Sequence, residues 1–70
     1  MSARASLGET DLEMAQRHVR EGERHLTLQH KIISWLTDHG NSTNEAKSLL
    51  RSMADMQRMD RELLARLEKV

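Results

Sequence analysis

The segment DHGNSTNE, residues 38–45, combines a helix stop with a helix start, and the course of the whole chain depends on it. Gly40 suits the left-handed conformation that closes many helices. Ser42 and Glu45 then fit the S/T-x-x-E capping box, in which Ser42 is the N-cap and its hydroxyl accepts a hydrogen bond from the backbone N–H three residues on. The chain is therefore expected to turn back on itself at Gly40.

Positions on both sides of this turn recur at alternating intervals of three and four residues, which is the pattern of a coiled-coil seam. The first seam consists of Leu12, Ala15, Val19, Gly22, Leu26, Gln29, Ile33 and Leu36. The second consists of Ala46, Leu49, Met53, Met56, Asp60, Leu63, Leu67 and Val70. Folding at Gly40 pairs 36 with 46, 22 with 60 and 12 with 70. The sequence thus predicts an all-α fold, an antiparallel two-helix hairpin with a coiled-coil-like seam, with one long rod as the alternative.

The chain of 70 residues is expected to form one small domain. Its expected parts are a flexible tail at 1–8 and a single helical-hairpin domain at 9–70, made of helix one (about 11–38), a turn (39–42) and helix two (about 43–68). Thr10 and Glu13 form a second S/T-x-x-E box at the start of helix one. No proline interrupts either helix.

The composition limits how such a domain can become stable. Aromatic residues make up 1% of the chain, a single Trp35, and cysteine is absent, which excludes disulfides, thiolate metal sites and a cysteine nucleophile. A core in a domain below about 70–80 residues rarely supplies more than roughly 3–5 kcal/mol. Self-association is therefore the expected remedy.

A second apolar edge supports the same expectation. Its predicted interface residues are Leu28, Ile32, Trp35, Leu50, Met59 and Leu64. Helices that are apolar over such a wide arc usually have two packing neighbours, so we expect a homodimer of hairpins that forms a four-helix bundle, with Trp35 as an anchor. Two alternatives are a different protein partner on the same edge, and a monomer with scattered surface hydrophobes.

Two layers of the predicted seam are polar, since Gly22 would face Asp60 and Gln29 would face Met53. Such groups can fix the register and oligomeric state of a coiled coil, which is our hypothesis for Asp60 and Gln29. A covered Asp60 would need a partner such as His18 or His25; otherwise water reaches it.

The sequence assigns no catalytic residue, cofactor or metal. His18, Glu21 and His25 share one helix face and are weak candidates for a metal site, but the stronger H-E-x-x-H spacing is missing. The histidine row could also respond to pH or be a solvated border. No Gly-rich phosphate loop or nucleophile motif occurs, so we do not expect an enzyme.

The charges balance at 11 basic and 11 acidic residues, which gives no global field to attract nucleic acid or an anionic membrane. A nucleic-acid-associated regulator is kept as an alternative function, because helix two carries six basic residues, and a metal-binding helical protein is the other. Apolar runs are too short to span a bilayer, and no signal-peptide core precedes the first helix, so a cytoplasmic protein is expected.

The chain resembles a group of short uncharacterised helical-hairpin proteins of proteobacteria, a domain of unknown function. The resemblance covers roughly residues 17–67 and is carried by His18-Val19-Arg20-Glu21-Gly22-Glu23-Arg24-His25, then Gln29, Ile32-Ile33, Leu36, Gly40, Thr43, Ala46, Leu49-Leu50, Met53 and Gln57. It implies a bacterial, cytoplasmic, stand-alone small protein and transfers no role to any residue. We therefore expect a small non-catalytic protein–protein interaction or regulatory module.

Overall fold

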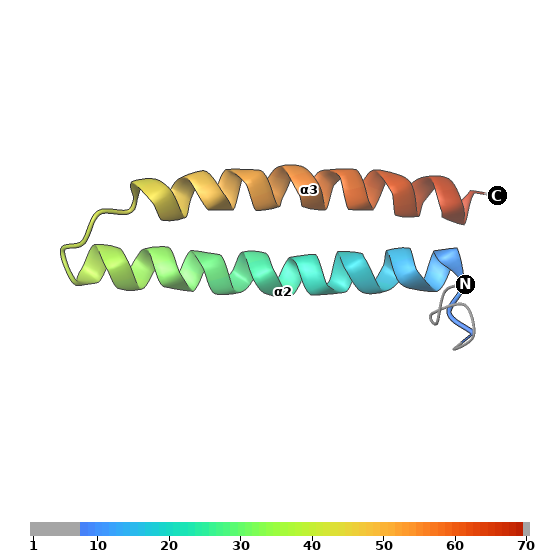
Figure 1. Cartoon of the computed structure of the whole chain (residues 1–70), viewed down its shortest axis with the longest axis horizontal. Coiled ribbons are helices and arrows are strands. Elements are labelled where there is room, and N and C mark those ends of the chain that lie inside the picture. The colour runs from blue at the N-terminus through green and yellow to red at the C-terminus, as the bar shows by residue number, and fades with distance from the viewer. Residues whose placement is uncertain (1–7, 70) are drawn as a thin grey trace.

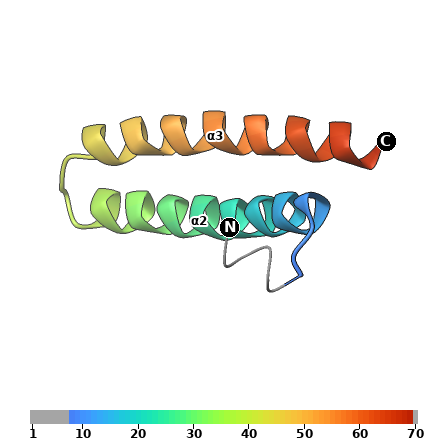
Figure 2. The same ribbon diagram turned by 45° about the vertical axis from the view of Figure 1, so that its right-hand side comes forward.

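The computed structural model describes residues 8–69, which form an antiparallel hairpin of two α-helices (Figure 1). Helix α2 spans Asp11–Asp38 and helix α3 spans Asn44–Glu68. The two helices lie side by side along their length, and a short turn joins them at one end (Figures 1 and 2). The predicted all-α hairpin is confirmed, and the rod is excluded. Apart from Gly8, the tail expected at 1–8 lies outside the described residues.

Helix α2 begins at the capping box that the sequence predicts. The Thr10 hydroxyl accepts a hydrogen bond from the Glu13 backbone N–H at 3.1 Å, and the Glu13 carboxylate accepts one from the Thr10 N–H at 2.9 Å. Two backbone donors that a helix start leaves unpaired are thereby satisfied. Asp11 and Glu13 also place negative charge in the first turn, which suits the helix dipole.

Gly40 closes α2 in the predicted left-handed conformation, with φ of +71°. The Asn41 N–H donates to the Leu36 carbonyl at 2.9 Å, and the Gly40 N–H donates to the Thr37 carbonyl at 3.1 Å. This pair of bonds is the Schellman arrangement, which satisfies the last carbonyls of a helix. The turn is therefore fixed by backbone hydrogen bonds together with one glycine.

The capping box predicted at the start of α3 is wrong. The N-cap is Thr43, not Ser42, and its side chain makes no capping hydrogen bond. The helix starts one residue later than the box requires, so Glu45 no longer occupies the third helical position that could reach back to the cap. The Ser42 hydroxyl accepts only a long bond of 3.4 Å from the Asn44 N–H.

This difference between the two helix starts predicts unequal effects of removing their hydroxyls. Thr10→Ala should lower the free energy of unfolding by about 1 kcal/mol, because it removes the cap of α2. Ser42→Ala is the matched control and should change it by no more than a few tenths of a kcal/mol. Urea denaturation followed by circular dichroism measures both. Equal losses in the two variants would contradict the assignment of the caps.

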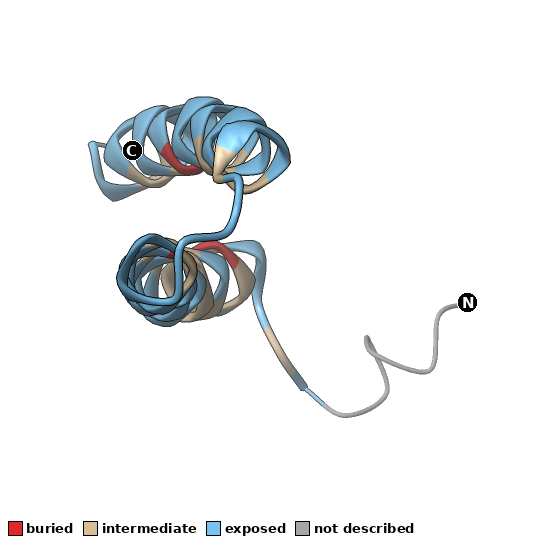
Figure 3. Cartoon of the chain, turned by 90° about the vertical axis from the view of Figure 1, so that its left-hand side faces the viewer, coloured by how far each residue is buried: buried red, intermediate tan, exposed pale blue. Residues whose placement is uncertain are grey.

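The seam of α3 differs from the predicted one, although the seam of α2 is as expected. The buried and half-buried positions of the second half are Thr43, Ala46, Leu50, Met53, Gln57, Asp60, Leu64 and Leu67. They face α2, while the outer surfaces of both helices are exposed (Figure 3). Gly22 faces Gln57 rather than Asp60, so the predicted register is also wrong. Among the described residues, Ala15 is the one buried apolar side chain, with 2% of its surface exposed.

This change reverses the predicted roles of five leucines and methionines. Leu50 and Leu64 were predicted at the interface, but they are half-buried in the seam of the hairpin itself. Leu49, Met56 and Leu63 were predicted in the seam, yet they are 52%, 58% and 43% exposed. The physical reason is that α3 is apolar over an arc wide enough to offer two adjacent seams, and the side chain that fits Gly22 selects one of them.

Candidate interaction face

Large exposed hydrophobic side chains gather into one stripe on each helix. Among the described residues these side chains are Leu28, Ile32, Trp35, Leu49, Met56, Met59 and Leu63, and we call them the apolar face. On α2 they are spaced by four and three residues, and on α3 by seven, three and four. Residues at these intervals share one side of a helix.

The two stripes lie on the same side of the hairpin. His25 precedes Leu28 by three residues on the α2 stripe, and it lines one surface groove together with Met56 of the α3 stripe. The opposite edge is polar, since Glu23 of α2 forms an ion pair there with Arg61 of α3. The apolar face therefore lies on one side of the hairpin, with its α2 stripe in the half of that helix nearer the turn. Four of its members were predicted as interface residues, namely Leu28, Ile32 and Trp35 on α2 and Met59 on α3.

Leu49, Met56 and Leu63 are the members that sequence reasoning missed, because it assigned them to the seam. Their spacing of seven residues is equally consistent with positions in the seam and with positions on an exposed face. A usable signal was present in the apolar neighbours Leu50 and Leu64, which make a second stripe directly beside the first. With both stripes apolar, one had to face α2 and the other had to be exposed.

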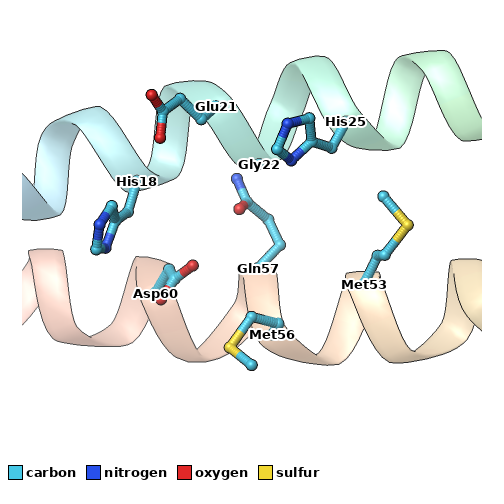
Figure 4. Close-up of a pocket in the computed structure, with 8 residues that line it drawn as sticks. All are labelled: His18, Glu21, Gly22, His25, Met53, Met56, Gln57 and Asp60. Carbon is cyan, nitrogen blue, oxygen red and sulfur yellow. The ribbon is translucent and has the colours of Figure 1, made fainter.

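The groove beside the apolar face is centred on a close contact between Gly22 and Gln57 (Figure 4). The Gln57 side chain points from α3 at the α2 backbone, where its Nε2 donates to the Val19 carbonyl at 2.8 Å and to Glu23 Oε1 at 3.0 Å. A Cβ atom on Gly22 would overlap Gln57 Oε1 and lie 2.7 Å from Cδ. Gly22 is therefore required for the close approach of Gln57.

Gln57 is 5% exposed, and its Oε1 atom is buried without a hydrogen-bond partner. Sequence reasoning did not single it out as a seam residue, because glutamine is normally a surface residue. The signal that could have found it is Gly22, whose missing side chain leaves room for a longer one on the facing helix.

Gln29 is the second buried polar residue, with 6% of its surface exposed. Its Nε2 donates to the Ala46 carbonyl at 2.9 Å, so it ties the middle of α2 to the first turn of α3. It does not face Met53, as the predicted register required. Asp60 is half-buried and lies near His18, at the end of the groove opposite Met53 (Figure 4). Within residues 8–69, the side-chain contacts between polar groups of the two helices therefore come from Gln29, Gln57 and the Glu23–Arg61 ion pair, and not from Asp60.

The weak metal candidates do not come together. His18, Glu21 and His25 all line the groove, but the Glu21 carboxylate points away from α3 (Figure 4). Within residues 8–69, no group of three or more histidine, cysteine, aspartate or glutamate side chains is placed to hold a metal ion. The geometry thus offers at most pairs of ligands, fewer than the three that even an open zinc site normally uses.

This arrangement predicts that zinc does not bind the native protein specifically. Titration with zinc to a few equivalents should leave the melting temperature and the imidazole NMR resonances of His18 and His25 unchanged. Simultaneous shifts of both histidines at one equivalent of zinc would contradict this. His30, which lies outside the groove, serves as the internal control.

Three arginines outside the apolar face form ion pairs with carboxylates. Arg17 contacts Glu9 at 3.0 Å and Glu21 at 3.3 Å, and the hydrogen bond to Glu9 raises the pKa of Arg17 above its usual value. On α3, Arg58 pairs with Asp55, and Arg61 pairs with Glu23 of α2. These pairs reduce the free positive charge that binding to a phosphate backbone would use.

Trp35 lies at the turn end of the apolar face and is 53% exposed. Its ring stacks on His39, with centroids 4.0 Å apart and planes inclined by 21°. The His39 Nδ1 also lies 2.8 Å from the Trp35 carbonyl oxygen. The indole is thereby held in place on one side and open on the other, which is the geometry of a preordered anchor.

No protein-family model matches this chain, and neither a curated protein nor a solved structure matches it. Within the described residues, neither helix combines the length and the apolar character that crossing a membrane requires. By its fold and its apolar face, the protein is an all-α helical hairpin with one exposed apolar side.

Proposed function

We propose that this protein is a small non-catalytic interaction module that self-associates through its apolar face. The observation that carries the proposal is the placement of all seven exposed large hydrophobes of residues 8–69 on one side of the hairpin. A bacterial cytoplasmic setting, which the resemblance described above implies, is part of the same proposal.

The small size of the core supports this proposal. One buried alanine cannot offset the conformational entropy of ordering two helices of 28 and 25 residues. The large hydrophobic side chains of the apolar face keep between 41% and 58% of their surface exposed, so the hairpin alone leaves apolar area that a second copy can cover.

Size-exclusion chromatography coupled to light scattering tests the proposal on the native chain. Between about 1 and 100 μM the mass should rise to, or stay at, twice the 8.1 kDa of the chain. A monomer over the whole range would overturn self-association. The apolar face would then have to be occupied by a different protein.

A further inference from the structure

The charges that border the apolar face differ between the two helices. Around Leu28 the border of α2 is basic: Arg24 and Lys31 flank Leu28 and line one shallow hollow with it, which Glu23, the ion-pair partner of Arg61, also lines. Nearer the turn, Asp38 lines a hollow beside Trp35. On α3 the border is acidic: Asp55 lies four residues before Met59 and Glu62 lies three residues after it. The four charged side chains that flank Leu28 and Met59 are exposed, and Asp55 also forms an exposed ion pair of 3.7 Å with Arg58 of its own helix.

We infer that the occupant of the apolar face is a second copy of this chain with its turn at the same end, so that α2 of each copy lies over the partner's α3. This inference rests on the proposed self-association and specifies its geometry. Two hairpins that meet face to face through a twofold axis have two simple arrangements. The axis runs either parallel to the helices or across them.

An axis parallel to the helices brings opposite charges together. Rotation about this axis does not move any residue along the direction of the helices. A residue of α2 therefore meets the residue of the partner's α3 that lies at the same height as the α3 residue beside it in its own hairpin. Gly22 stands opposite Gln57. Two residues further along α2 is Arg24, and two residues earlier on α3 is Asp55, so Arg24 meets the partner's Asp55.

The same count places a second pair of opposite charges at the border. Arg17, which also contacts Glu9 and Glu21 of its own chain, lies five residues before Gly22. Glu62 lies five residues after Gln57, so Arg17 and Glu62 also stand at one height. The symmetry repeats each pair, which gives four contacts between opposite charges in one dimer. Complementary borders of this kind select one arrangement of an interface, while the apolar area supplies the affinity.

An axis across the helices brings like charges together. It places α2 on the partner's α2 with the turns at opposite ends, so Arg24 and Lys31 meet the same basic side chains. Asp55 and Glu62 on α3 likewise meet the partner's acidic side chains. Like charges across an interface are unfavourable, so the border disfavours this arrangement.

A spin label on Asn41→Cys distinguishes the arrangements, because Asn41 lies in the turn and the chain has no other cysteine. With the turns at the same end, the two labels should be roughly 10–25 Å apart, about one or two helix spacings. With the turns at opposite ends, they should be about 40 Å apart or more, the length of α2. Pulsed electron paramagnetic resonance measures this distance. A dimer with the long distance overturns the inference and leaves self-association intact, whereas a monomer overturns both.

Charge reversal gives a second readout whose sign depends on the arrangement. Arg24→Asp should weaken the dimer by about three- to tenfold, because it faces the partner's Asp55 twice. Adding Asp55→Arg should restore most of the loss. Lys47→Asp is the control, since Lys47 lies on the same edge of α3 as Arg61 and should change the dissociation constant less than twofold. If Arg24→Asp strengthens the dimer, the helices lie in the other arrangement.

Discussion

Gly22→Ala is expected to destabilise the hairpin by about 1–2 kcal/mol, although the same change in an unobstructed helix stabilises it by about 1 kcal/mol. The new Cβ would overlap Gln57 Oε1, so the amide end of the glutamine must move away from the α2 backbone. It would then lose its bonds to the Val19 carbonyl and to the Glu23 carboxylate. A hydrogen bond of this kind contributes about 1 kcal/mol to stability when its acceptor is neutral and about 1.5–3 kcal/mol when its acceptor is charged.

Thermal denaturation at one fixed protein concentration measures this loss. For a domain of this size, 1 kcal/mol corresponds to a shift of about 4–8 °C in Tm. The concentration must be fixed because binding of a second copy would stabilise the folded state by mass action. A Tm for Gly22→Ala equal to or above that of the unchanged protein would contradict the role assigned to Gly22.

The control is the same substitution in the absence of the glutamine. In a Gln57→Ala background, Gly22→Ala meets no long side chain and should stabilise the hairpin by up to about 1 kcal/mol. The double-mutant cycle therefore predicts coupling of about 1–3 kcal/mol between the two positions. Additive effects would mean that Gly22 and Gln57 do not act on each other.

The features of the fold that could be predicted from the sequence are those set by local chemistry. Thr10 and Glu13 form their box within one helical turn, and Gly40 closes α2 through its own backbone conformation. Each of these signals involves residues close together in the chain. The prediction at Ser42 failed by one residue, which was enough to move Glu45 out of the position from which it could cap the helix.

The rotation of α3 could not be predicted in this way, because it depends on contacts between distant residues. Leu49 and Leu50, like Leu63 and Leu64, are adjacent and equally apolar, so periodicity does not say which of each pair faces α2. The choice follows from Gln57, which fits against Gly22 and finds hydrogen-bond acceptors there. A hydrophobic pattern cannot identify a polar side chain that is buried because it fits one specific position on the facing helix.

Leu49→Glu is expected to convert the self-associated protein to a monomer while leaving the hairpin folded. Leu49 is 52% exposed within the hairpin, so its replacement removes little from the seam. In a dimer, burying such a side chain contributes about 1.5–3 kcal/mol, and the symmetry doubles this. Burying an unpaired carboxylate adds a further cost. The dissociation constant should therefore rise by about 100-fold or more, since each 1.4 kcal/mol is tenfold.

Ala54→Glu is the matched control, because Ala54 is also exposed on α3 but lies on the edge of Arg61, seven residues away and opposite the apolar face. Both variants add the same charge to the same helix. Any difference between their dissociation constants is therefore due to the position of the substitution on the apolar face and not to the added charge. Sedimentation equilibrium measures association, and circular dichroism at a concentration where both variants are monomeric measures helix content. If both variants associate like the unchanged protein, the apolar face is not where the copies meet. If Leu49→Glu loses its helix content while Ala54→Glu keeps it, Leu49 supports the hairpin itself and belongs functionally to the seam.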